Sequence, residues 1–317
     1  SGGLVGSEMC IRDSHLTVDD LIQPIFVKEG LDGIESIDSL PEVNRFGLNA
    51  LDEEVARIQE NKIKAIAIFP VIDPLKKDDR GTESTNEDNL VCEAIRQIKK
   101  NSELAVIADV ALDPYTSHGH DGVLDSNGYV DNDDSLPILV SQALTLAKAG
   151  ADMVAPSDMM DGRISSIRNM LEEKGFVNTI ILSYAAKYSS KFYGPFRDAV
   201  SSSASLGSGS KDTYQMSVAN INEALHEVKM DIEEGADIVM VKPGLPYLDV
   251  IKSVKETFKV PTFAYQVSGE YAMLKAAIQN GWLSEEVMME SLLSFKRAGA
   301  DCVLTYAANQ IAETLNK

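Results

Sequence analysis

The chain has 317 residues and a mass of 34.5 kDa, a length that suits one large domain or two ordinary ones. Its 29 Lys and Arg against 49 Asp and Glu give a net charge of −20, which disfavours nucleic acids and anionic membranes as partners. Apolar runs such as residues 65–69 are too short to span a bilayer, and we expect no secretion signal. Cys10, Cys92 and Cys302 lie far apart, which favours a reducing, cytoplasmic compartment.

Short apolar segments alternate with helical stretches along the chain. Eight of them are β-branched or almost continuously apolar, as expected of strands covered on both faces. These predicted strands are residues 21–27, 64–70, 105–111, 153–157, 179–186, 238–242, 261–267 and 302–306. Eight parallel strands with right-handed crossovers fit a closed (β/α)8 TIM barrel. An open doubly wound sheet is the alternative, weakened because no GxGxxG loop follows the first strand.

Three helix-to-strand junctions repeat almost letter for letter. They read KAGADMV (148–154), EEGADIV (233–239) and RAGADCV (297–303). Each places a Gly where a helix is expected to end, because glycine tolerates the left-handed conformation that closes a helix. The repeat therefore favours one strand–helix unit used several times.

Two segments interrupt this rhythm. Residues 73–89 are polar and acidic, and residues 201–210 (SSSASLGSGS) are small and flexible. Both follow the carboxyl ends of predicted strands, the end where barrel enzymes place their sites. They are either mobile lids over such a site or ordinary surface loops.

Two lysines stand at the ends of neighbouring predicted strands, Lys187 after the fifth and Lys242 in the sixth. Adjacent strands lie ~4.8 Å apart, so the two side chains can approach each other. A neighbouring cation and an apolar wall both lower the pKa of an amine, and a neutral amine attacks a carbonyl to form a Schiff base. The alternative is that each lysine reaches solvent from its strand end.

A polar stretch, DVALDPYTSHGHDG (109–122), follows the third predicted strand. Its candidate metal ligands are Asp109, Asp113, His118, His120 and Asp121. Such residues also cap loops without binding a metal, so both interpretations stay open. Because Asp109 lies on the strand itself, its carboxylate can balance the charges of the lysines.

Four further side chains are candidates for binding substrate. Arg197 and Lys211 flank the Ser/Gly-rich segment and can hold a carboxylate, although exposed cations are common on surfaces. Ser268 and Tyr306 stand at the ends of the last two predicted strands and can add neutral donors.

Several blocks resemble one known family, in that family's order. GADIVMVKPGLPY (235–247) is similar to the active-site signature of the porphobilinogen synthase family, also called 5-aminolevulinate dehydratase, and KYSSKFYGPFRDA (187–199) resembles its second lysine segment. APSDMMDGR (155–163), DTYQM (212–216) and YQVSGEYAM (265–273) resemble further blocks. The resemblance implies a (β/α)8 hydro-lyase that condenses two 5-aminolevulinate molecules into porphobilinogen for tetrapyrrole synthesis.

The resemblance also implies roles for the paired lysines. Lys242 matches the lysine that forms a Schiff base with the substrate giving the propionate side, and Lys187 matches the one that holds the second substrate. The iminium is an electron sink, and Asp109 is a candidate acid–base group for the dehydrations.

The remaining matches concern the substrates' carboxylates. Arg197 matches a substrate-binding arginine, and Lys211 falls where the family has a second basic residue, although Ser210 replaces the acid expected before it. Ser268 and Tyr306 match groups that bind the first substrate's carboxylate.

The metal pattern departs from that of zinc-dependent relatives. Ala111, Asp113 and Asp121 stand where those members have three cysteines, so we expect no zinc in the active site. The Asp-rich loop resembles that of magnesium-responsive members, since carboxylates favour Mg²⁺. Glu227 matches the glutamate that holds an allosteric Mg²⁺; by helical periodicity alone it is only a polar helix residue.

The N-terminus departs most from the family pattern. Residues 1–14 show little of the family's Arg-rich arm, and we take residues 15–317 as the barrel domain. A homo-oligomer is expected, as an octamer, hexamer or dimer. Two other functions stay open: a class I aldolase, which needs one Schiff-base lysine instead of two, and a non-catalytic barrel that serves as a binding protein.

Overall fold

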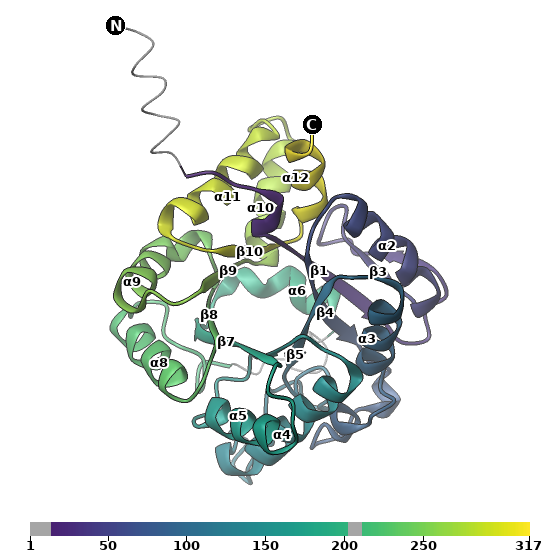
Figure 1. The fold of residues 1–317 in the computed structure, drawn as a ribbon, viewed down its shortest axis with the longest axis vertical. Coiled ribbons are helices and arrows are strands. Elements are labelled where there is room, and N and C mark those ends of the chain that lie inside the picture. The colour runs from purple at the N-terminus through teal and green to yellow at the C-terminus, as the bar shows by residue number, and fades with distance from the viewer. Residues whose placement is uncertain (1–13, 202–210) are drawn as a thin grey trace, which may run out of the picture.

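The chain folds into a closed barrel of parallel strands, which Figure 1 shows end-on. The computed structural model describes residues 14–201 and 211–317. The barrel strands are β1 (Leu21–Lys28), β4 (Ala65–Val71), β5 (Ala105–Val110), β6 (Met153–Pro156), β7 (Ile180–Lys187), β8 (Ile238–Lys242), β9 (Thr262–Gln266) and β10 (Cys302–Thr305). Strand β1 pairs with β4 on one side and β10 on the other, which closes the sheet.

The predicted (β/α)8 barrel is therefore confirmed, and the open doubly wound sheet is wrong. Each of the eight predicted strands is present, with bounds that differ by one residue at most. The predicted atypical segment, residues 1–14, lies outside the described residues except for Ser14, as does nearly all of the predicted lid at residues 201–210.

Helices surround the barrel in Figure 1. The α-helices are α2 (Leu48–Glu60), α3 (Leu90–Asn101), α4 (Asn132–Ala149), α5 (Arg163–Glu173), α6 (Gly194–Ala199), α8 (Asn222–Glu233), α9 (Leu248–Phe258), α10 (Ser268–Gln279), α11 (Glu286–Ala298) and α12 (Ala308–Leu315). Short 3-10 helices are η1 (Val18–Asp20), η2 (Pro74–Lys76), η3 (Thr82–Thr85), η4 (Lys191–Tyr193) and η5 (Leu245–Tyr247). In the described part of the chain, no helix combines the length and apolar character needed to cross a membrane.

The three repeated junctions form one recurring clamp at the amino ends of the strands. Their glycines, Gly150, Gly235 and Gly299, end helices at φ of 109°, 108° and 111°, a conformation that strongly favours glycine. The aspartate two residues later then bonds to the preceding strand.

The bonds of these aspartates repeat in each copy. The carboxylates of Asp152, Asp237 and Asp301 accept the backbone N–H of Val106 in β5, Ile181 in β7 and Thr262 in β9, at 2.8, 2.8 and 2.7 Å. Each also pairs with a cation on the helix before that strand: Lys99, Arg168 and Lys255. The clamp therefore ties β5 to β6, β7 to β8 and β9 to β10.

A short hairpin outside the barrel holds the helix that lies over its opening. Strands β2 (Ile34–Ser36) and β3 (Asn44–Phe46) are antiparallel, and β3 pairs with the carboxyl end of β1. Arg45 of β3 donates to the carbonyls of Asp198 and Ala199, both at 2.7 Å. These bonds anchor α6, which Figure 1 places across the ring of strands.

Candidate active site

Two buried lysines meet at the carboxyl end of the barrel. Lys187 is the last residue of β7 and Lys242 the last of β8, and the register of the two strands places them side by side. They are 6% and 8% exposed, so neither side chain reaches freely into solvent. The sequence-based expectation that the two lysines are neighbours agrees with this geometry.

Aromatic rings surround the amine of Lys242. Its Nζ lies 5.1 Å from the ring centre of Tyr184, 5.2 Å from those of Tyr193 and Phe196, and 4.9 Å from that of Tyr265. We call these four rings the aromatic box. Three of them come from barrel strands or the η4 segment, and Phe196 comes from α6. The box excludes water from the amine on several sides.

This environment favours the neutral form of the Lys242 amine. Burial and the nearby charge of Lys187 lower the pKa of Lys242 to about 7, against the opposing effect of Asp109. A substantial fraction of the amine is therefore neutral at pH 7 and able to attack a carbonyl.

Asp109 lies in the same cavity as both lysines. Burial and the neighbouring charge of Asp113 raise its pKa to about 7, although the two lysines act in the opposite direction. One oxygen of this carboxyl group is buried without a hydrogen-bond partner. A carboxyl group that changes protonation state near neutrality, beside two amines, suits general acid–base work.

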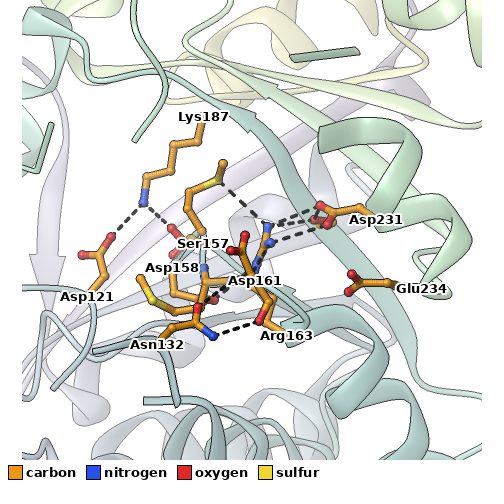
Figure 2. A network of polar contacts seen from close by, with 12 residues as sticks. Asp121, Asn132, Ser157, Asp158, Asp161, Arg163, Lys187, Asp231 and Glu234 are labelled. Atoms are coloured by element: carbon orange, nitrogen blue, oxygen red, sulfur yellow. Dashed lines mark hydrogen bonds and ion pairs between the residues drawn. The ribbon is translucent and has the colours of Figure 1, made fainter. Parts of the chain in front are cut away.

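Lys187 contacts residues from the loops that follow two other barrel strands, β5 and β6, as Figure 2 shows. Its Nζ donates to the backbone carbonyl of Ser157, which follows β6, and lies 3.3 Å from Oδ2 of Asp121. Asp121 is fully buried, but Lys187 and Lys211 outweigh the effect of burial and lower its pKa.

Lys211 sits between two aspartates of the loop after β5. Its Nζ is 3.1 Å from Asp113 and 2.5 Å from Asp121. Burial opposes the charge of Lys211, but the two carboxylates dominate and raise its pKa. Asp113 and Asp121, predicted as candidate metal ligands, thus bind an ammonium group in this structure.

The predicted substrate-binding residues divide into two groups. Arg197 lines a small cavity together with Lys187, Lys211 and Lys242. Ser268 and Tyr306 lie behind the aromatic box instead of lining that cavity. The Ser268 hydroxyl accepts the N–H of Phe196 at 2.8 Å, and the Tyr306 hydroxyl is 3.0 Å from that of Tyr265.

A buried ionic network supports the loop that holds Lys187. Figure 2 shows Arg163 at its centre: the guanidinium lies 3.3 Å from Asp231 of α8 and 3.5 Å from Asp158, and donates to Ser183 of β7 at 3.2 Å. Asp158 directly follows Ser157, whose carbonyl binds Lys187. The sequence did not predict this network, because Asp158 and Arg163 stand out there only as part of the family-like block at residues 155–163.

Glu227 lies away from the lysines, in a larger cavity of about 540 Å³. Burial raises its pKa, with further increases from Asp231 and Asp161. Asp161 and Glu223 line the same cavity, so several carboxylates face it. This donor set fits a hydrated Mg²⁺, which keeps several waters and needs only one or two carboxylates.

The two histidines of the 109–122 stretch do not join a metal cluster. His118 bonds to the carbonyl of Asp79, and His120 lies 3.2 Å from the hydroxyl of Tyr214. Within residues 14–201 and 211–317, no three His, Cys, Asp or Glu side chains converge closely enough to enclose a metal ion.

The aromatic box escaped prediction from the sequence. Tyr184 and Tyr265 stand on two different strands, and Tyr193 and Phe196 lie three residues apart in the segment that follows Lys187, so sequence spacing alone does not bring the four rings together. The predicted strands 179–186 and 261–267 do contain Tyr184 and Tyr265, which was the available signal.

A (β/α)8 barrel with two buried lysines at its carboxyl mouth, the pKa of one of them lowered to about 7, is an arrangement that suits Schiff-base chemistry. A family model described as "Delta-aminolevulinic acid dehydratase" matches residues 6–314. The chain belongs to the delta-aminolevulinic acid dehydratase family of hydro-lyases, also named porphobilinogen synthases.

Individual relatives agree with this assignment. The chain is 55% identical over 307 residues to a delta-aminolevulinic acid dehydratase of Bradyrhizobium diazoefficiens, covering 96% of this chain and 86% of the relative. It is 50% identical over 305 residues to that of Methanothermus sociabilis, covering 96% and 94%. A crystal structure of the Toxoplasma gondii enzyme with the product porphobilinogen superposes with a TM-score of 0.95 at 46% identity, covering 98% of this chain and 88% of that one.

Proposed function

We propose that this protein condenses two molecules of 5-aminolevulinate into porphobilinogen with loss of two waters, a step of tetrapyrrole synthesis. The main support is the pair of buried lysines at one barrel mouth, with the pKa of Lys242 lowered to about 7. An aldolase needs only one such lysine. The family membership points to the same reaction.

The chemistry begins at the amines. Neutral Lys242 attacks the ketone of one substrate, and loss of water gives an imine that the aromatic box shields from solvent. Lys187 forms the second imine. Holding both substrates side by side makes the condensation effectively unimolecular. Asp109 takes up and returns protons during the dehydrations.

The substrates' carboxylates need partners in this acidic protein. Arg197 and Lys211 line the cavity between the lysines, which suits them to this role. Lys211 is already paired with Asp113 and Asp121, so an incoming carboxylate must exchange with them. Ser268 and Tyr306 are proposed to bind the first substrate's carboxylate after small shifts of Phe196 and Tyr265.

We propose that the active site works without zinc, and that Glu227 holds an allosteric Mg²⁺. Ala111, Asp113 and Asp121 offer no thiolate, and the Lys211 ammonium lies where Asp113 and Asp121 converge. The acidic cavity around Glu227 supports the Mg²⁺ site. There the ion would neutralise carboxylates that repel one another.

The cellular compartment, the oligomeric state and the partners of the enzyme are also proposals. We place it in the cytoplasm or another reducing compartment, supported by widely spaced cysteines and by bacterial and archaeal relatives. We further propose that it works as a homo-oligomer. The acidic surface supports an absence of nucleic-acid and membrane partners.

The proposal is tested by incubating the protein with 5-aminolevulinate, with and without Mg²⁺, and detecting the pyrrole with Ehrlich reagent. We expect colour with wild type and none with Lys187→Ala or Lys242→Ala. Lys174→Ala, an exposed lysine at the opposite end of the barrel, is the matched control and should keep full activity. Absence of pyrrole from the wild type under both conditions would overturn the proposal.

The aldolase alternative is separated by borohydride trapping. Reduction in the presence of a keto acid, followed by peptide mapping, identifies which lysines form imines. Trapping at Lys242 together with loss of pyrrole in both alanine variants supports a two-lysine synthase, whereas full activity of Lys187→Ala contradicts it.

A further inference from the structure

One buried carboxylate joins the segment after Lys242 to the start of the next helix. Glu270, in the first turn of α10, is completely buried. Its carboxylate accepts three backbone N–H groups: those of Gly244 at 3.1 Å, Leu245 at 2.6 Å and Val267 at 2.8 Å. Gly244 and Leu245 follow Lys242 by two and three residues.

The turn held by Glu270 also packs closely against α11 and β9. A side chain at Gly244 would place its Cβ 2.1 Å from the ring of Phe295 and 2.9 Å from the carbonyl oxygen of Tyr265. Tyr265 belongs to the aromatic box. The turn is therefore fixed by hydrogen bonds to Glu270 and by close packing against α11 and β9, two to three residues after Lys242.

Helix capping alone does not account for this arrangement. A glutamate in the first turn of a helix commonly reaches back to the N–H just before the helix, as Glu270 does with Val267. The contact with Val267 is local and needs only one carboxylate oxygen. The bonds to Gly244 and Leu245 instead connect α10 to the turn that follows β8. Burial raises the pKa of Glu270 to about 7, which is a cost that a purely local cap on the surface would avoid.

We infer that Glu270 is a positioning residue for Lys242: by fixing the turn after β8, it holds the amine inside the aromatic box. The same carboxylate fixes Val267, next to Ser268, whose hydroxyl accepts the N–H of Phe196, one wall of the box. This inference rests on the proposed role of Lys242 as the Schiff-base nucleophile.

Two variants separate this role from capping. In Glu270→Gln an amide NH2 replaces one oxygen and points a donor at a backbone donor, so at least one of the three bonds is lost. In Glu270→Asp the charge and the bond to Val267 are kept, but the shorter side chain no longer spans to Gly244 and Leu245.

Asp301→Asn is the matched control. Asp301 also accepts a backbone N–H, from Thr262, but at the opposite end of the barrel from Lys242. Its loss destabilises the barrel without touching the lysine, so it reports what general loss of stability does to the chemistry.

The experiment measures trapping of Lys242 by 4-oxopentanoate and borohydride, with peptide mapping, from about pH 7 to about pH 10, and compares the plateau rates, so that a change in the pKa of Lys242 is separated from a change in its position. We expect Glu270→Gln and Glu270→Asp to slow trapping roughly tenfold or more. In porphobilinogen assays kcat should fall by a similar factor with KM little changed. Asp301→Asn should lower the thermal unfolding midpoint and trap at the wild-type rate.

Wild-type trapping rates in both Glu270 variants would overturn the inference, as would loss of folding in both, which would assign Glu270 to stability alone. If only Glu270→Gln fails to fold, Glu270→Asp decides. The trapping needs neither a second substrate nor a pyrrole. A wild type that traps at Lys242 but makes no porphobilinogen would therefore refute the proposed function and leave this test intact.

Discussion

Lys242 and Asp109 both change protonation state near neutral pH, and they share one cavity. The amine must lose its proton to react, while the carboxyl group serves proton transfer only if it can hold a proton. Similar pKa values let a single active site contain a neutral amine and a proton donor at the same pH.

The first prediction concerns the pH dependence of imine formation. Because the pKa of Lys242 is lowered to about 7, the neutral fraction, and hence the trapping rate with 4-oxopentanoate, should rise with pH and reach half its plateau near pH 7. Lys187→Met removes a neighbouring positive charge, so the midpoint should move to higher pH. An unchanged or lower midpoint would show that Lys187 does not depress the pKa of Lys242.

The second prediction separates imine formation from turnover. Asp109→Asn keeps the shape of the side chain but removes its acid–base function. Because Asp109 favours the protonated form of Lys242, its loss should lower the pKa of Lys242 and preserve trapping at pH 7. Porphobilinogen formation should fall roughly 100-fold or more. Equal loss of trapping and turnover would assign Asp109 to substrate binding instead.

At the level of elements, the Arg163 network joins the β6 loop, β7 and α8. Removing one partner of a buried ion pair leaves an uncompensated charge and typically costs about 3–5 kcal/mol. The third prediction is that Arg163→Met lowers the free energy of unfolding by about this amount, because Asp158 and Asp231 lose their cation.

A surface pair supplies the control for that measurement. Lys252 pairs with Glu256 while both side chains remain more than half exposed, so Lys252→Met should change the free energy by no more than about 1 kcal/mol. Urea denaturation of both variants gives the comparison. Similar losses in the two variants would contradict the importance of the buried network.

The fourth prediction concerns the repeated clamp. Gly235 has φ of 108°, where an L-residue is strained, and an added Cβ would also lie 3.1 Å from Cγ of Arg168. Gly235→Ala should therefore cost about 1–3 kcal/mol of unfolding free energy. Gly194, with negative φ and open space around it, is the control, and Gly194→Ala should be neutral in the same denaturation assay.

The elements show what the sequence could and could not predict. The strands were predictable because each is a short apolar run between helices, and the position of Lys187 and Lys242 at adjacent strand ends followed from strand order. Strands β2 and β3 were missed because three-residue strands leave almost no periodic pattern. The contacts of Glu270 with Gly244 and Leu245 were missed because these two residues follow a different strand, β8, and sequence spacing holds no information about that approach.

At the scale of the whole molecule, an acidic protein gathers cationic side chains at its candidate site. The net charge is −20, yet Lys187, Arg197, Lys211 and Lys242 gather around one small cavity. The candidate site is therefore richer in cations than the molecule as a whole, and Asp113 and Asp121 pair with Lys187 and Lys211 there.

The fifth prediction follows from the surface charge. Self-repulsion among excess carboxylates destabilises the folded state and is screened by salt. The thermal unfolding midpoint should rise by a few degrees as NaCl increases from about 10 mM to about 300 mM. MgCl2 at equal ionic strength should raise it further through Glu227, and Glu227→Ala should abolish only that extra increase. A falling midpoint in NaCl would contradict the repulsion argument.

The clamps at Asp152, Asp237 and Asp301 make the turns at the amino end of the barrel unequal. The turn between α8 and β8 contains a clamp, whereas the exposed turn between α5 and β7, residues 174–178, contains none. A circularly permuted chain that starts in residues 174–178 keeps every clamped strand pair continuous. A permuted chain that starts at Gly235 separates Asp237 from α8, the helix that precedes it. We therefore expect turns without a clamp to tolerate new chain termini better than turns that contain one.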